Sequence, residues 1–163
     1  MKAFNLISSE LQQEYEVRLI GHVSPEMKNE LLACVTGSLR GKIIFKGDAT
    51  FAELCAAYKN ASLFVLPSLV EAFGLPIVEA MAAGVPVLVS NTTALPEIAG
   101  KAGLTFDPYD PADLAGKMEQ VLLEDKLAKR MVELGLERAK MFIWENTVKQ
   151  TLQCIDKLLH NEN

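Results

Sequence analysis

The sequence predicts an α/β fold, a doubly wound parallel sheet followed by a helical C-terminal segment. Three observations lead to this prediction. Short apolar runs alternate with segments of helical spacing along residues 2–90. The apolar runs are continuous, which is typical of strands covered by helices on both faces. Residues 111–159 carry no clear strand pattern. Strands that alternate with helices pair in parallel through right-handed crossovers.

The first elements follow from apolar spacing and from helix-start signals. A helix is predicted over residues 2–13 and a strand over residues 16–21, which ends at a glycine. Ser24 as N-cap and Pro25 at the first helical position begin a helix that runs to about Leu39.

The middle of the chain repeats this alternation. A strand over residues 42–46 precedes a helix over 51–60, which Thr50 and Glu53 begin as a capping box. The remaining elements are strands at 62–66 and 86–90, and helices at 75–83, 111–123, 126–140 and 145–159.

Composition and charge narrow the function classes. The chain has 163 residues, 50% of them apolar, and a formal net charge of −5. This length is typical of one domain, so residues 1–163 are interpreted as a single unit. The acidic balance disfavours general binding to nucleic acid or to anionic membranes. No apolar run approaches the roughly 18 residues that span a bilayer, and the first residues lack a signal-peptide pattern.

Cysteine usage predicts a reducing compartment and hence a cytoplasmic protein. Cys34, Cys55 and Cys154 are odd in number and widely spaced, and the first two are expected to be buried apolar side chains. Without a Cys-x-x-Cys pair, and with only His22 and His160, we expect no metal site. The sequence also lacks Gly-x-Gly-x-x-Gly and Walker-type phosphate loops, which disfavours a dinucleotide enzyme or a P-loop ATPase.

The segment over residues 67–84 is the most informative stretch. It follows a predicted strand, and ligands of open parallel sheets bind beyond the carboxyl ends of the strands. Gly74 allows the backbone to approach a ligand, and Leu75 opens a helix whose free N–H groups suit a phosphate. Glu71 lies in the preceding loop and Glu79 about one turn into the helix.

The two glutamates leave two interpretations open. With Glu97, they are the only charged residues between Lys59 and Lys101. In one interpretation Glu79 is a favourable charge near a helix start and Glu71 is an exposed loop residue. In the other, the two carboxylates accept hydrogen bonds from sugar hydroxyls on either side of a phosphate.

At these residues the chain resembles a known family. The stretch Pro67–Val87, with its Glu-x7-Glu core, resembles the donor-site signature of retaining group 1 (family 4) glycosyltransferases, which have the GT-B fold. Upstream, Ile44–Gly47 with Glu53, Leu54 and Tyr58 resembles the segment that holds the base. Further matches are Ser90-Asn91, Ala94–Ile98, Ala102–Leu104, Phe106–Pro108, Leu136–Ala139 and Phe142–Glu145.

The resemblance implies a role for each matching residue. Glu71 would hold hydroxyls of the transferred sugar as the catalytic-site carboxylate. The backbone of Phe73, Gly74 and Leu75 would face the diphosphate and the sugar, and Glu79 would bind the ribose. The residues implied for the base are Lys46, Gly47, Ala49 and Leu54. No cofactor and no metal are implied, because the helix dipole and basic side chains stabilise the leaving diphosphate.

The resemblance also implies the context of the domain. The chain would be the Rossmann-like C-terminal half of a GT-B enzyme, the donor-binding domain of a hexosyltransferase of polysaccharide biosynthesis. Its acceptor would be a glycan or a lipid-linked molecule, bound by an N-terminal acceptor domain that is absent here. Any contact of the enzyme with the inner face of the membrane would be made only through that missing domain. Because the family's first strand and basic segment have no match here, we expect an N-terminally truncated domain that is inactive alone.

Two alternatives differ from this interpretation. The first is a non-catalytic Rossmann-like module that binds a nucleotide sugar or a protein. The second is another GT-B enzyme, a phosphorylase or an epimerase. A phosphorylase is disfavoured because the site region has no lysine for pyridoxal phosphate, and an epimerase is supported only by His22.

The last predicted helix carries an apolar stripe formed by Val148, Leu152, Ile155 and Leu159. It either packs on its own domain or is exposed and drives self-association.

Overall fold

A computed structural model describes residues 1–160 of the protein. Its strands are β1 (Val17–Ile20), β2 (Ile43–Lys46), β3 (Phe64–Leu66), β4 (Val87–Ser90) and β5 (Gly103–Phe106). Its α-helices are α1 (Ser9–Glu14), α2 (Pro25–Ala33), α3 (Phe51–Lys59), α4 (Leu75–Ala82), α5 (Leu95–Ala99), α6 (Pro111–Leu123), α7 (Asp125–Ala139) and α8 (Trp144–Leu159). Its short 3-10 helices are η1 (Lys2–Asn5), η2 (Gly37–Lys42) and η3 (Gly100–Ala102). The predicted α/β fold with a helical C-terminal segment is confirmed.

All strand pairs are parallel, and they form two sheets. One sheet pairs β1 with β2, and the other has the order β3-β4-β5. Within residues 1–160, only β4 pairs on both edges, and each of the other four strands has one edge without a partner strand.

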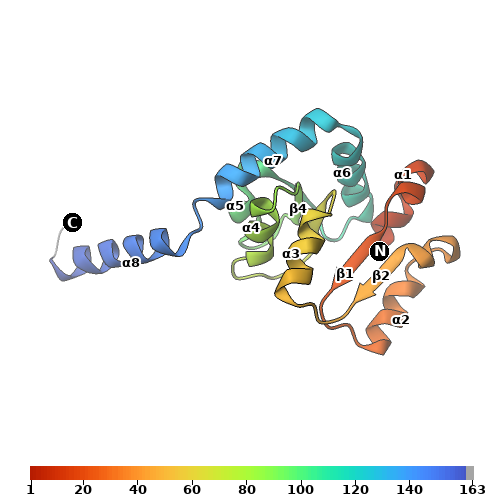
Figure 1. Ribbon diagram of the computed structural model, residues 1–163, viewed down its shortest axis with the longest axis horizontal. Coiled ribbons are helices and arrows are strands. Elements are labelled where there is room, and N and C mark those ends of the chain that lie inside the picture. The colour runs from red at the N-terminus through yellow and green to blue at the C-terminus, as the bar shows by residue number, and fades with distance from the viewer. Residues whose placement is uncertain (161–163) are drawn as a thin grey trace.

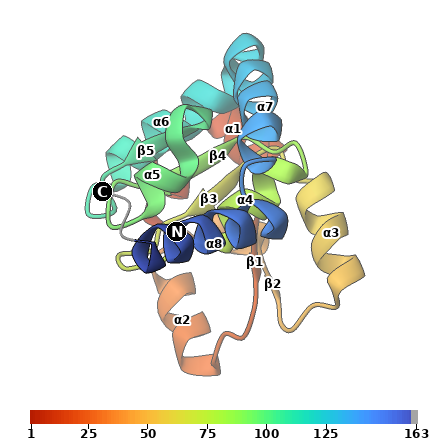
Figure 2. The same cartoon turned by 90° about the vertical axis from the view of Figure 1, so that its left-hand side faces the viewer.

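The central strand β4 is covered on both faces, as its continuous apolar run predicts. Val87 and Val89 pack into a cluster with α4 and α5, whereas Leu88 points into a second cluster with α6 and α7. Figure 2 shows α3 and α6 on opposite sides of β3 and β4. Alternate side chains of this strand thus enter two different cores.

Helix α6 joins the two sheets. Its residues Leu114 and Met118 contact both the core behind β4 and β5 and the core formed by η1, α1, β1 and β2. The β1-β2 sheet is therefore attached to the rest of the domain by shared apolar packing rather than by strand pairing.

Two predicted helices are shorter than the sequence pattern indicates. The helix over residues 2–13 is interrupted, because Ser8 acts as N-cap of α1 and accepts a hydrogen bond from the Leu11 amide. The helix after Pro25 ends at Ala33. There Asn5 donates to the Cys34 carbonyl and accepts from the Thr36 amide, which satisfies the end of α2 from another element.

Strand β5 and helix α5 were not predicted from the sequence. Gly103 opens β5, and a Cβ built there would lie 2.9 Å from both Ala99 Cβ and Val87 Cγ2. The strand thus depends on a glycine that permits close approach to β4 and α5.

Helix α8 lies apart from the rest of the domain and extends away from it in Figure 1. None of its residues is buried, and the stripe side chains are 45–74% exposed. Of the two interpretations of the stripe, the structure shows the exposed face, and self-association through it stays a prediction.

Two further sequence expectations concern thiols and membranes. Cys34 and Cys55 are half-buried rather than buried, because α2 and α3 have no fully buried face, and Cys154 on α8 is exposed. Within residues 1–160, none of the helices combines the length and the apolar character that a membrane span requires.

Candidate functional site

The loop between β3 and α4 brings the predicted site to the carboxyl end of the second sheet. Gly74 is the N-cap of α4 and has a left-handed backbone with φ of +93°. Pro76 has no N–H, and the Ile77 amide donates to the Gly74 carbonyl at 2.9 Å. Within residues 1–160, the amides of Gly74 and Leu75 make no hydrogen bond; Gly74 is buried and Leu75 is exposed. Unpaired amides at the start of a helix suit an anion.

Glu71 is half-buried and is held from two sides. The Ser68 hydroxyl donates to Glu71 Oε1 at 2.9 Å, and the Glu71 amide donates to Thr93 Oγ1 at 3.2 Å. The loop after β3 is thereby connected to the loop after β4. One carboxylate oxygen, Oε2, is left without a partner within residues 1–160, so it can accept a hydrogen bond from a ligand.

Glu79 is exposed on α4 and has one side-chain partner, Tyr58 of α3. Tyr58 Oη donates to Glu79 Oε2 at 3.0 Å, and its ring packs against Phe64 with 5.7 Å between centroids. Burial, with the hydrogen bond to Glu79, raises the pKa of the Tyr58 phenol above its usual value. The Tyr58 phenol therefore keeps its proton at neutral pH and donates a hydrogen bond to Glu79.

Phe73 is anchored by aromatic contacts from α7 and the segment after it. Its ring meets Phe142 edge-on with 5.6 Å between centroids, and the Arg138 guanidinium lies 5.1 Å from the Phe142 ring centre. Arg138 also donates to the carbonyls of Glu97 and Ile98. These contacts fix the backbone that precedes Gly74.

The residues implied for the base lie together between β2 and α3. Lys46 ends β2, Gly47 and Ala49 lie in the connection that follows it, and Leu54 is half-buried on α3. A groove of about 370 Å³ beside them includes Lys46 and Ala49 but neither Glu71 nor Glu79. The structure thus gathers the predicted residues into two groups, one at β2–α3 and one at β3–α4, with Tyr58 and Glu79 linking α3 to α4.

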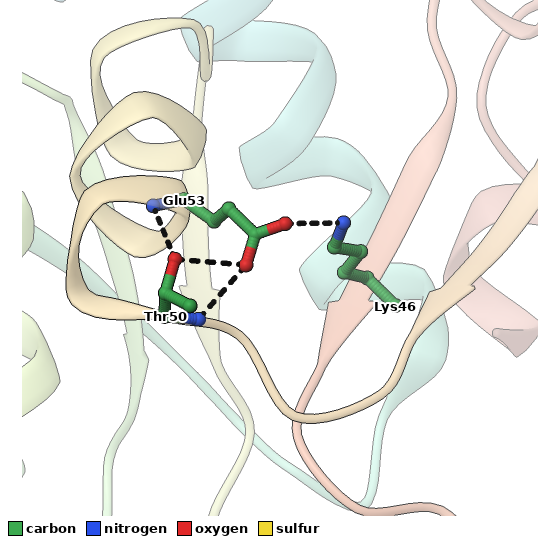
Figure 3. Close-up of polar contacts among 3 residues, drawn as sticks. All are labelled: Lys46, Thr50 and Glu53. Atoms are coloured by element: carbon green, nitrogen blue, oxygen red, sulfur yellow. Dashed lines mark hydrogen bonds and ion pairs between the residues drawn. The ribbon is translucent and has the colours of Figure 1, made fainter.

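Lys46 is tied to the start of α3, as Figure 3 shows. Its Nζ lies 2.8 Å from Glu53 Oε1. Glu53 Oε2 accepts from both the amide and the hydroxyl of Thr50, and the Glu53 amide donates to Thr50 Oγ1. The predicted capping box is confirmed, and its glutamate also pairs with a lysine of the predicted base site.

This arrangement predicts a pH effect. The hydrogen bond from Lys46, followed by those from Thr50, lowers the pKa of Glu53 from 4.5 to about 2. Because the pKa of Glu53 is depressed in the folded state, its ionised carboxylate stabilises the fold above pH 4.5. This contribution to the free energy of unfolding is lost as pH falls toward 2. We expect Glu53→Gln to be less stable at pH 6 and to converge on the wild type near pH 2, measured by urea unfolding. Curves that stay equally separated from pH 6 to pH 2 would contradict this role.

Residues 1–160 contain no group of three or more histidine, cysteine, aspartate or glutamate side chains placed to hold a metal ion. The absence of a metal requirement stays an expectation.

The residues that hold Glu71 were not predicted from the sequence. Ser68, Ser90, Thr92 and Thr93 form a hydroxyl cluster at the carboxyl ends of β3 and β4. The run of Ser90, Asn91, Thr92 and Thr93 directly after a buried strand was a signal for it, since short hydroxyl side chains bond to nearby backbone.

Comparison with known proteins agrees with this fold. The family model described as Glycosyl transferases group 1 matches residues 1–138. The serotype-specific mannosyltransferase WbdA of Escherichia coli is 36% identical over 161 residues, which is 98% of this chain and 20% of WbdA. The O-antigen chain mannosyltransferase B of the same species is 38% identical over 152 residues, 93% of this chain and 40% of that protein.

A solved structure shows the same fold. The Anabaena protein Alr3699/HepE in complex with UDP-glucose superimposes with a TM-score of 0.78 at 19% identity, over 97% of this chain and 43% of that one. The architecture is thus the Rossmann-like half of a GT-B glycosyltransferase. The chain belongs to the group 1 glycosyltransferase family. It spans between a fifth and two fifths of the length of these mannosyltransferases.

Proposed function

We propose that this chain is the donor-binding domain of a retaining hexosyltransferase of the family 4 type, and that it binds a nucleoside-diphosphate sugar. The observation that carries the proposal is the β3–α4 loop, where free amides at a helix start lie next to the half-buried Glu71. Free amides suit the diphosphate, and a carboxylate accepts hydrogen bonds from sugar hydroxyls.

The remaining residues extend this site toward the nucleoside. Glu79, oriented by Tyr58, is proposed to accept the ribose hydroxyls. Lys46, Gly47, Ala49 and Leu54 are proposed to seat the base. The Anabaena neighbour with bound UDP-glucose supports a nucleotide sugar as the ligand, and the two Escherichia coli relatives support mannose as the transferred sugar.

The proposed chemistry is a front-face displacement. The acceptor hydroxyl forms a bond to the anomeric carbon as the bond from that carbon to the diphosphate oxygen breaks. The departing oxygen takes the acceptor proton, so configuration is retained without an enzyme nucleophile. The amides of Gly74 and Leu75 stabilise the charge that develops on the diphosphate. Neither a metal nor another cofactor is part of this proposal.

The wider context follows the relatives. The proposed acceptor is a growing glycan or a lipid-linked sugar, bound by an acceptor domain that these residues do not supply. The proposed location is cytoplasmic, with membrane contact only through that domain. The domain alone is proposed to bind donor without transferring sugar.

Calorimetric titration of the chain with UDP-glucose, GDP-mannose and the free diphosphates tests the proposal. We expect GDP-mannose to bind weakly and saturably, and UDP-glucose is the alternative donor. The affinity should not depend on added Mg²⁺. Binding to neither sugar nucleotide at millimolar concentration would overturn the proposed function.

A further inference from the structure

A strained residue lies next to the predicted sugar-binding carboxylate. Thr93 is the only non-glycine residue within residues 1–160 with positive φ, at +50°. β-branched residues avoid this left-handed region because the side chain crowds the backbone. Thr93 is also exposed, so burial of its side chain does not compensate for the strain. Strain of this kind concentrates at functional sites.

The contact that Thr93 makes requires a hydroxyl at this position. Its Oγ1 accepts the hydrogen bond from the Glu71 amide at 3.2 Å, across 22 residues of sequence. Glycine would adopt the same φ without strain, but it has no hydroxyl to offer this amide.

The rest of the hydroxyl cluster holds the other end of the same short loop. Ser90, the one fully buried polar side chain within residues 1–160, and Thr92 both donate to the Ser68 carbonyl. The Ser68 hydroxyl then donates to Glu71 Oε1. Glu71 is therefore held at its amide by Thr93 and at its carboxylate by Ser68, whose carbonyl is fixed by the end of β4 and the loop that follows it.

We propose that Thr93 is a positioning residue, which holds Glu71 where its free carboxylate oxygen meets the sugar of the donor. This inference rests on the proposed function. Thr93 acts through the Glu71 backbone, so its contribution concerns the sugar and not the nucleoside diphosphate, which the α4 amides and the β2–α3 segment bind.

The test compares Thr93→Gly with Thr93→Ser by calorimetry, with GDP-mannose and GDP as probes. Glycine removes the hydroxyl and relieves the strain, whereas serine keeps the hydroxyl. We expect Thr93→Gly to raise the Kd for GDP-mannose about tenfold and to leave the Kd for GDP within about twofold, since one lost hydrogen bond to an ordered loop has an effect of this size. Thr93→Ser should bind both as the wild type does.

Urea unfolding of the same variants separates positioning from structural support. We expect Thr93→Gly to be as stable as the wild type, because the relieved strain offsets the lost hydrogen bond. If Thr93→Gly weakens both ligands equally, or neither, while the wild type binds GDP-mannose, the positioning role is wrong and the proposed function stands. If the wild type binds neither GDP-mannose nor UDP-glucose, the proposed function fails and this inference with it.

Discussion

Glu71→Ala is expected to remove most of the affinity for the sugar nucleotide while the domain remains folded. A carboxylate that accepts hydrogen bonds from two sugar hydroxyls contributes about 1.5–3 kcal/mol for each bond, which corresponds to a loss of at least about 100-fold for both. In the enzyme that carries this domain, turnover should fall by a similar factor. Calorimetry with GDP-mannose and a transfer assay measure the two effects.

The control for this experiment is Glu133→Ala. Glu133 is exposed on α7, outside the predicted site, and carries the same charge. We expect it to bind like the wild type. Both variants should unfold within about 1 kcal/mol of the wild type, because neither glutamate is fully buried. Unchanged affinity and turnover in Glu71→Ala would remove Glu71 from the site.

Gly74→Ala is expected to destabilise the domain by about 2–4 kcal/mol, through backbone strain and overpacking together. The left-handed backbone at φ +93° disfavours any Cβ. A Cβ there would lie 2.8 Å from Leu95 Cδ2 and 3.0 Å from Ile77 Cδ1. Both side chains are fully buried, so neither moves aside freely. The midpoint of urea unfolding measures the loss.

Gly116→Ala is the matched control, because it adds the same methyl group to α6. A Cβ at Gly116 meets no atom within 4 Å, and the residue lies in a regular helix. We expect this variant to gain up to about 1 kcal/mol from the higher helix propensity of alanine. Equal unfolding midpoints for Gly74→Ala and wild type would mean that the α4 start tolerates a side chain.

Local signals in the sequence located most elements correctly. The continuous apolar runs contain β1 to β4, and the caps at Ser24 and Thr50 begin α2 and α3 as predicted. These signals work because a cap or an apolar run acts over a few neighbouring residues. The missed strand β5 has no such signal, since Gly103 is defined by its approach to Val87, sixteen positions earlier.

The candidate site divides in the same way. The glycine and the two glutamates around α4 follow from their order in the chain, and the family resemblance adds their roles. The contacts that hold Glu71 do not follow from the order of the chain, because they join residues 68–71 to residues 90–93. Those loops meet because β3 pairs with β4 in a register that aligns Leu66 with Val89, and only the folded sheet establishes that register.

The sequence by itself determined the alternation of strands and helices, the helix starts, and the stretch that carries the glutamates and Gly74. The tertiary structure alone decided the division into two sheets, the strained contact of Thr93 with Glu71, and the exposure of α8. An apolar pattern specifies which face of an element avoids water, but the partner of that face depends on elements distant in the chain. For Leu88 the partners are α6 and α7, whereas for Leu152 on α8 the described residues supply none.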